Sequence, residues 1–490
     1  MGNDVNTMLP IFSCLMLSCP MIALVFNTVL ISRPIFAARC ASYCIGMGYL
    51  LGMGLLVYFS LSKKAVLYLL ISLNSLSLLL CCLVLLVSFI VHRFSLRYMQ
   101  GDRLYRRFFL LLSALTFTVL LMILADNLFL FWAAWSFSNL FLALLMVHKK
   151  EWMASRNSGI LAFYTLAAGS LSLLLALVLL NLGYSSNSIL ALTQANPGHS
   201  SILSLAIGLI LVAALTQSGL FPFHRWLISS LNSPTPVSAL MHAGLINGGG
   251  ILIVKFAPLM ILHSEWLTVL FMAGAFSALL GTIWKLMQHD IKKMLACSTM
   301  AQMGFMMMQC GLGLFAAAIA HLCWHGLFKA HLFLSSGSAV TQKKPVSKSS
   351  KVSPVLLIVS FIGGIGTMVS FGFITNKPIS FFEASTFVLY FAFIAGAQLM
   401  FTWVRNHQTV PGLLLGLLLA SGAGLLYGTS IHLIEWLIPD VSVINAPKLS
   451  LIHAVVMIVF GALWAAFNLG FHQTISQSKL GCWLYMNLFN

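Results

Sequence analysis

The chain has 490 residues, of which 60% are hydrophobic and 7% are charged, and its mean hydropathy is +0.99. This composition excludes a water-soluble protein, because too few polar side chains are present to cover an apolar core. The formal net charge of +17 would by itself be compatible with a nucleic-acid-binding protein.

Long apolar runs dominate the chain. Runs of about 20 residues, separated by short polar joints, predict an all-α polytopic membrane protein with about 14–15 transmembrane helices. Strands are not predicted, because alternation of polar and apolar residues is absent. The 10 cysteines contain no C-x-x-C pair, so they are interpreted as small apolar side chains and no metal site or cofactor is expected in this chain.

The basic residues follow the loops of this predicted topology. Of the 26 Lys and Arg residues, 20 fall in every second loop, whereas the intervening loops hold four, Lys63, Lys64, Lys377 and Lys448. This asymmetry orients the N-terminus outside and the C-terminus in the cytoplasm. The excess charge therefore reflects topology and lipid contact, and no nucleic-acid partner is expected.

The N-terminal part of the chain predicts packing surfaces only. The start, MGNDVNTM, lacks the basic segment of a cleaved signal, so the apolar run 8–31 is expected to remain as a helix. The runs 41–60 and 65–91 contain no buried charge and are interpreted as packing and partner surface. Asp126 lies at a helix junction and is predicted to be the N-cap of the following helix.

Residues 214–259 predict an interrupted membrane helix. A helix that carries Gln217 breaks near Pro222, and a second helix starts after Pro234 and contains His242. Proline and glycine at membrane depth free backbone groups that need partners in a protein-lined or wet cavity. His242 is either a proton-carrying group or a structural partner of this backbone, and Gln217 is at most a group that holds water. Lys255 is interpreted as an anchor at the outer end of its helix.

A second interruption is predicted at 370–382, in a similarly placed later span. Two interrupted helices in corresponding halves favour an inverted repeat with the transport path between the halves. We therefore divide the chain into N-terminal helices (1–107), a first repeat (108–260), a second repeat (261–405) and C-terminal helices (406–490).

The span 317–340 carries His321, His325 and Lys329 at steps of four residues. On a helix this spacing places all three on one face. Ionisable residues inside a membrane helix usually mark a proton or ion path. The alternative is that neighbouring helices satisfy neutral histidines while Lys329 reaches toward the lipid headgroups, although this does not account for two histidines placed deeper.

Four ordered motifs carry a resemblance to a known superfamily. They are FPFHRWL (221–227), SPTPVSALMHAG (233–244), HDIKKMLACSTMAQMGFMMMQCG (289–311) and HLCWHGLFKAHLFLSSGS (321–338). Together they resemble the antiporter-like proton-translocating subunits of respiratory complex I and Mrp cation/proton antiporters. MHAGLINGGG and MAQMGFMMMQCGLG resemble most closely the DabB family, the membrane subunits of DabA/DabB inorganic carbon pumps.

The resemblance implies about fourteen helices with two inverted five-helix repeats, each with one broken helix. It assigns ion translocation to Lys329, with His325 and His321 beside it. It assigns the same role to His242 and to Lys377, which lies in the later broken helix. Gln217 falls where the family has a lysine.

Two departures from the pattern weaken an assignment to complex I. The glutamate that follows a tryptophan in the fifth helix corresponds to Ala133, and the lysine of the seventh corresponds to Gln217. All 9 acidic residues lie in loops or near predicted helix ends, so no carboxylate in mid-membrane is expected opposite Lys329.

We therefore expect a proton- or sodium-translocating subunit of an energy-coupled uptake pump for carbon dioxide or bicarbonate, in a bacterial cytoplasmic membrane. The resemblance implies a complex with a DabA-like zinc protein that carries the carbon chemistry, so this chain alone is not expected to be an enzyme. The alternatives are a proton-pumping subunit of an NADH-quinone oxidoreductase-like complex, an Mrp-type antiporter, or a scaffold that has lost transport.

Overall fold

The predicted all-α membrane fold is confirmed. The computed structural model describes residues 2–63, 65–68, 70–195, 198, 200–337, 354–377, 380, 383–438, 448–470, 478–479 and 483, with side chains from residue 10 onward. Within these ranges, 12 helices are long and apolar enough to cross a membrane. The helices α8, α14 and α15 supplement them: α8 is shorter, whereas α14 and α15 are long but carry more polar residues. The chain is therefore a multi-pass membrane protein.

The described residues form two compact units. The first contains Met1–Gly311 and His321–Thr341, and the second contains Leu312–Ala320 and Gln342–Asn490. The helix α15 (Phe315–Leu334) contributes to both units.

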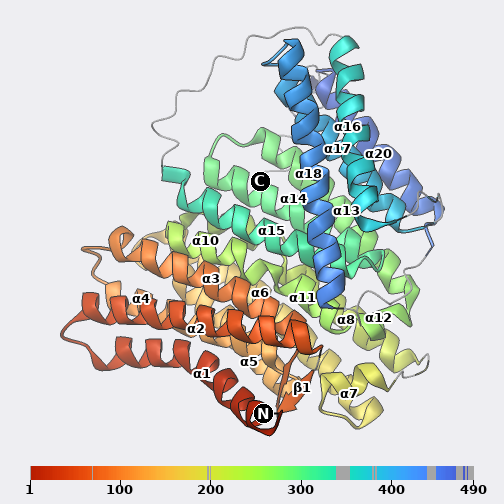
Figure 1. Cartoon of the computed structure of the whole chain (residues 1–490). Helices are drawn as coiled ribbons and strands as arrows, with labels where there is room; N and C mark the ends of the chain where they lie inside the picture. The colour runs from red at the N-terminus through yellow and green to blue at the C-terminus, as the bar shows by residue number, and fades with distance from the viewer. Residues whose placement is uncertain are drawn as a thin grey trace. The chain divides into compact units, whose positions relative to one another are not determined.

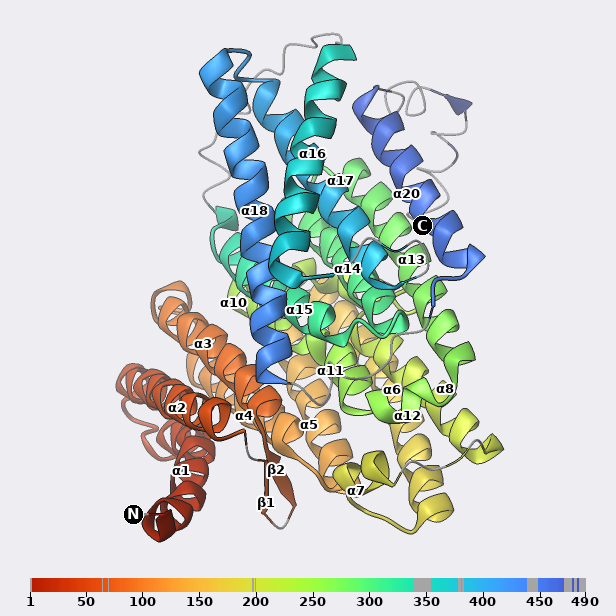
Figure 2. The same ribbon diagram turned by 45° about the vertical axis from the view of Figure 1, so that its right-hand side comes forward.

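Six long helices begin the first unit: α1 (Gly2–Val29), α2 (Pro34–Ser62), α3 (Ser75–Tyr98), α4 (Tyr105–Leu124), α5 (Leu128–Met146) and α6 (Met153–Tyr184). The first four lie side by side, α1 on α2 and α4, and α3 on α2 and α4 (Figures 1 and 2). The helices α5 and α6 extend this layer toward the interrupted segment.

The predicted interruption near Pro222 is present and is longer than one break. In the described residues, the segment between α6 and α13 consists of eight short elements: α7 (Ile189–Gln194), α8 (Ser201–Gln217), α9 (Arg225–Ser229), η1 (Ser230–Asn232), α10 (Thr235–Ala243), η2 (Leu245–Asn247), α11 (Gly248–Lys255) and α12 (Ala257–Ile261). Gln217 is the last residue of α8, and His242 lies in the last turn of α10 before the 3-10 turn η2. The helices α13 (Ser264–Met287) and α14 (Ile291–Gly311) follow as an antiparallel pair.

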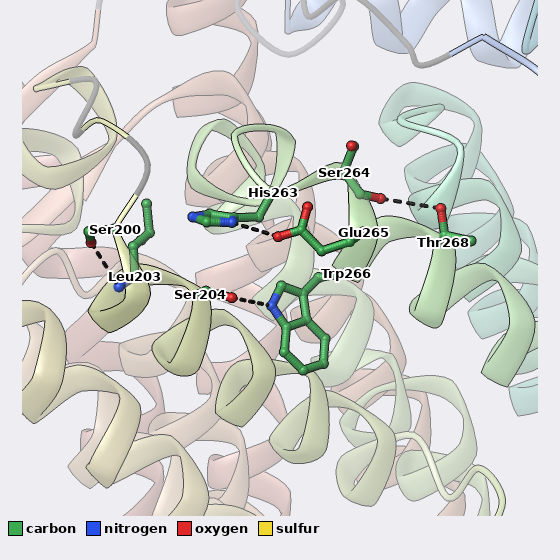
Figure 3. A network of polar contacts seen from close by, with 8 residues as sticks. All are labelled: Ser200, Leu203, Ser204, His263, Ser264, Glu265, Trp266 and Thr268. Atoms are coloured by element: carbon green, nitrogen blue, oxygen red, sulfur yellow. Dashed lines mark hydrogen bonds and ion pairs between the residues drawn. The ribbon is translucent and has the colours of Figure 1, made fainter.

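Polar contacts fix the start of α8 against the start of α13 (Figure 3). The indole Nε1 of Trp266 donates to Oγ of Ser204 at 2.9 Å. The ring of Trp266 occupies space left by Gly208, where an added Cβ would lie 2.8 Å from it. Beside it, Nδ1 of His263 lies 2.7 Å from Oε1 of Glu265. These contacts hold the helix that carries Gln217.

The second unit contains α16 (Pro354–Thr375), α17 (Ser385–Val404), α18 (Val410–Leu437) and α20 (Leu451–Asn468). In both views α16, α17 and α18 pack together (Figures 1 and 2). A stripe of small residues on α18 allows this approach; at Gly424, for example, an added Cβ would lie 2.4 Å from the carbonyl oxygen of Thr367 on α16.

Two sequence expectations need correction. A short antiparallel hairpin, β1 (Val66–Tyr68) and β2 (Ile71–Leu73), is present although no strand was predicted; three residues are too few to show an alternating pattern. The N-cap of α5 is Asn127, whose Oδ1 accepts from the backbone of Phe129 and Leu130, so the prediction for Asp126 was wrong.

The second interruption begins at Asn376, which has a positive φ of 50° after an unbroken α16. Residues 378–379 and 381–382 of this predicted break lie outside the described residues. The inverted repeat therefore stays a prediction.

Candidate functional site

The centre of the candidate site is one face of α15. Because His321, His325 and Lys329 follow at steps of four in a continuous helix, they lie on the same side. The side chain of Lys329 is 1% exposed, and its Nζ donates a 3.0 Å hydrogen bond to the carbonyl oxygen of Leu295 on α14. Within the described ranges no carboxylate forms an ion pair with Lys329. The ammonium group is thus held inside the protein.

The two histidines of this face stack along the helix. The rings of His321 and His325 are 6.1 Å apart with an interplanar angle of 17°, and His321 also contacts Phe305 on α14 at 5.5 Å. Both ring nitrogens of His325 and Nε2 of His321 are buried without a hydrogen-bond partner among the residues that the structure describes. Buried imidazole nitrogens of this kind are able to bind water or exchange protons.

His242 joins this group from α10. It is 0% exposed, and its ring stacks on Phe333 of α15 at 4.3 Å with an interplanar angle of 11°. The two helices approach closely at Gly326, where an added Cβ would lie 2.7 Å from the carbonyl oxygen of Ala243. His242 lies within electrostatic range of Lys329 and His325. Of the predicted residues, the structure therefore brings together His242, His321, His325 and Lys329.

Gln217 lies in a separate polar contact between α5, α8 and η2. Its Nε2 donates to Oδ1 of Asn139 at 3.0 Å and to the carbonyl oxygen of Leu245 at 3.3 Å. Gln217 is 2% exposed. A neutral amide therefore stands where the resemblance leads one to expect a lysine, and its side-chain partner, Asn139, is also uncharged.

The residue Asn139 was missed by sequence reasoning. It lines a cavity of about 410 Å³ between α5 and α6, together with Ala133 and Ser136. The helix α5 contains two tryptophans, Trp132 and Trp135. Asn139 lies one turn after the second of them, and Ser136 follows that tryptophan directly. A polar residue at a helical spacing from this second tryptophan was the signal that could have identified Asn139.

Lys377 belongs to the second unit and has an acidic partner. Its Nζ lies 2.7 Å from Oε1 of Glu435, near the end of α18, and both side chains are about a quarter exposed, at 22% and 24%. A carboxylate is therefore available to this lysine, unlike Lys329. Among the described residues, no group of three or more His, Cys, Asp and Glu side chains is arranged to hold a metal ion.

Comparison with known proteins identifies the family and the fold. Residues 125–354 match the family described as NADH:quinone oxidoreductase/Mrp antiporter, transmembrane, and residues 62–109 match the N-terminus of complex I chain 5. A solved structure of the Mrp complex from Dietzia sp. has the same fold, with a TM-score of 0.66 and 19% identity over 96% of this chain and 57% of that chain. The first match contains the whole α8–α15 region.

Curated relatives narrow the family further. The chain is 41% identical over 266 residues to the probable inorganic carbon transporter subunit DabB1 of Halothiobacillus neapolitanus, which covers 53% of this chain and 47% of that relative. It is 34% identical over 424 residues to the probable inorganic carbon transporter subunit DabB of Bacillus anthracis, which covers 84% of this chain and 81% of that relative. The chain therefore belongs to the DabB family of probable inorganic carbon transporter subunits, within the antiporter-like membrane subunits related to complex I and Mrp.

Proposed function

We propose that this chain is the ion-translocating membrane subunit of an energy-coupled inorganic carbon uptake pump. Proton or sodium flow through it would drive uptake of carbon dioxide or bicarbonate by a DabA-like zinc-containing partner. The names of the DabB relatives support the substrate class, and the multisubunit Mrp complex supports assembly with other chains. Further support is that the side chains of His242, His325 and Lys329 are buried within the first unit.

The observation that carries this proposal is the burial of Lys329. A cation at membrane depth costs a few kcal/mol on insertion scales. Its only hydrogen bond in the part of the chain that the structure describes goes to a backbone carbonyl, at Leu295. This cost is expected to be offset by a task that requires a charge, and His325 one turn away is suited to exchange the proton.

The proposed path within the first unit runs along the α15 face. A proton passes between Lys329 and His325, and then to His321 or His242 by way of water held at the unpartnered ring nitrogens. Gln217 with Asn139 holds water or orients backbone groups next to η2, and takes no proton itself. In the second unit, Lys377 exchanges a proton with Glu435.

The test is partner-dependent carbon uptake in intact cells that lack carbonic anhydrase. We expect Lys329→Met to abolish uptake while the chain still inserts and co-purifies with its partner, because methionine fills a similar volume without charge. Lys329→Arg should also fail, since a guanidinium does not release its proton. The control is Lys150→Met, which removes an exposed lysine of the loop between α5 and α6. Near-normal uptake by Lys329→Met in an intact complex would refute the proton path.

The orientation and the division of labour are part of the same proposal. The N-terminus lies outside and the C-terminus in the cytoplasm of a bacterial inner membrane, as the distribution of basic loops supports. Co-expression with the partner should restore growth of a cell without carbonic anhydrase, whereas this chain alone should not. Equal rescue by this chain alone would contradict the proposed division of labour.

A cation/proton antiporter or a redox-linked pump subunit is the second candidate, favoured by the family match over residues 125–354. Affinity purification of the chain at its natural level distinguishes the candidates. A single large zinc protein as partner supports the carbon pump, whereas quinone-reducing or Mrp subunits would support the second candidate.

A further inference from the structure

A second lysine in the first unit, Lys255, has a defined set of partners. It is the last residue of α11, and its Nζ donates a 2.6 Å hydrogen bond to the carbonyl oxygen of Ala125, the C-cap of α4. The ammonium also lies 5.1 Å from the ring centroid of Phe131 on α5. A cation at the C-terminus of a helix satisfies a free carbonyl group and the negative end of the helix dipole. Lys255 therefore connects α11 to the α4–α5 junction.

The residue next to Ala125 is a buried acid. Asp126 is 4% exposed, its Oδ1 accepts from the backbone N–H of Leu190 at 2.9 Å, and its Oδ2 accepts from the hydroxyl of Ser188. These groups belong to the first turn of α7, where a negative charge is favourable. The backbone N–H of Asp126 donates to Leu70, in the turn of the β-hairpin, at 2.8 Å. Asp126 thus ties the hairpin, the α4–α5 junction and α7 together.

We infer that Lys255 and Asp126 form a latch that fixes the end of the interrupted segment, and that Lys255 is a positioning residue for His242. Lys255 holds the carbonyl oxygen of Ala125, and Asp126 is the next residue in the chain, so the two charges act on the same junction without a direct ion pair in the described residues. Only Gly244 separates α10 from η2, and α11 follows η2 directly, so a fixed end of α11 limits movement of the turn that carries His242. The middle of the segment is held by Gln217 through the carbonyl oxygen of Leu245. This inference rests on the proposed function.

The contacts favour a latch over a second proton-exchanging pair. Both carboxylate oxygens of Asp126 accept from donors at the start of a helix, and the ammonium of Lys255 donates to a backbone carbonyl. The stack of His321 and His325, in contrast, offers ring nitrogens without a partner in the described residues. Because Asp126 uses both of its carboxylate oxygens in these hydrogen bonds, it holds a geometry and is poorly placed to accept a proton from Lys255.

A native cysteine reports on the latch without any transport assay. Cys81 is 0% exposed and lies on α3, which packs on α4, the helix whose C-cap carbonyl accepts from Lys255. Cys310 on α14 is also 0% exposed and lies on another helix. Membranes are treated with N-ethylmaleimide, and the alkylation of each cysteine is measured by peptide mass spectrometry. Cys310 then serves as the internal control.

We expect Lys255→Met to expose Cys81 to alkylation, with Cys310 still protected, and to lower carbon uptake about tenfold in a complex that still assembles. Lys255→Arg keeps the cation and its donors, so it should preserve both protection and uptake. The matched control is Lys150→Met, which removes an exposed lysine of the loop between α5 and α6. Asp126→Asn removes the charge but keeps an acceptor, and should raise alkylation of Cys81 in the same direction.

Each outcome decides between the roles. Loss of uptake in Lys255→Arg with Cys81 still protected would overturn the latch and assign Lys255 to the proton path. Unchanged uptake and unchanged alkylation of Cys81 in Lys255→Met would also overturn the latch. If the Lys255→Met protein does not accumulate in membranes, the same result in Asp126→Asn would overturn it. Absence of carbon uptake in the unmodified complex would refute the proposed function alone, because the alkylation result stands by itself.

Discussion

The side-chain amide of Gln217 donates to the side-chain oxygen of Asn139 at 3.0 Å, between the end of α8 and the middle of α5. Asn139 in turn donates through Nδ2 to the hydroxyl of Ser170 on α6 at 3.2 Å. Three helices of the first unit are thus joined by uncharged groups. A charged pair of lysine and carboxylate is not needed to hold them.

Restoring the family's charges is expected to fail. Ala133→Glu with Gln217→Lys should not increase carbon uptake, because Ala133 lines the cavity between α5 and α6 and the lysine would lose the contact with Asn139. Uptake in cells with equal amounts of complex is the measurement. A several-fold gain would show that this charged route is still used.

Removing one member of the amide pair should destabilise the first unit. Gln217→Leu leaves the buried oxygen of Asn139 and the carbonyl of Leu245 without this donor, at a cost of about 1–3 kcal/mol. The thermal midpoint of the detergent-solubilised chain is the measurement. The double variant Gln217→Leu with Asn139→Leu should recover part of the loss, since no unpaired amide then remains; a strictly additive loss would argue against the pair.

The glycines at the start of α11 should not tolerate a side chain. At Gly249 an added Cβ would lie 2.2 Å from Oγ of Ser218 and 2.4 Å from the carbonyl oxygen of Ala214, both on or next to α8. We expect Gly249→Ala to reduce the amount of folded chain in membranes, measured by fluorescence-detected size exclusion. The matched control is Gly54→Ala in α2, where no atom lies within 4 Å of the new Cβ. Normal folding of Gly249→Ala would show that α8 and α11 separate easily.

An acid-sensitive contact is expected at the loop between α3 and α4. Partial burial alone would raise the pKa of Asp102, but the backbone hydrogen bond from Leu104 and the close contact with His148 outweigh it and hold this pKa below its ordinary value. Nε2 of His148 lies 3.1 Å from the carboxylate. A carboxyl group with a depressed pKa stabilises the fold above its unfolded-state pKa and loses this contribution as the pH falls through the folded-state pKa.

The thermal midpoint of wild type should therefore exceed that of Asp102→Asn by a constant amount near neutral pH. The difference should shrink only below the ordinary carboxyl pKa of about 4. Measurement runs from about pH 7 to about pH 3 on both proteins in the same detergent. A difference that already disappears near neutral pH would assign the effect to another group.

The ion pair of Lys377 and Glu435 should contribute little to stability, because both side chains are partly exposed and such pairs are worth at most about 1 kcal/mol. Under the proposed function, Lys377→Met and Glu435→Gln should nevertheless lower carbon uptake by similar factors. Double-mutant cycles on uptake and on the thermal midpoint measure the two effects. Unchanged uptake in both variants would remove the pair from the path.

Much about this protein could be predicted from the sequence because the signals are local. Hydrophobic length decides which segments cross the membrane, and proline marked the interruption before α10. The spacing of His321, His325 and Lys329 places them on one face of any α-helix, whatever surrounds it. The family followed from four short motifs in a fixed order.

The tertiary structure decided which partners these side chains have. Leu295 is 34 residues from Lys329, Asn139 is 78 residues from Gln217, and Ala125 is 130 residues from Lys255. No periodicity predicts such pairs, since a backbone carbonyl or an uncharged amide leaves no mark in a hydropathy pattern. Asp126 is an example: its position next to a helix start was evident, but its carboxylate accepts from Ser188 and Leu190 at the start of α7 and not from the next helix along the chain. Local spacing determines which residues share one face of a helix, whereas packing between distant segments determines which groups that face contacts.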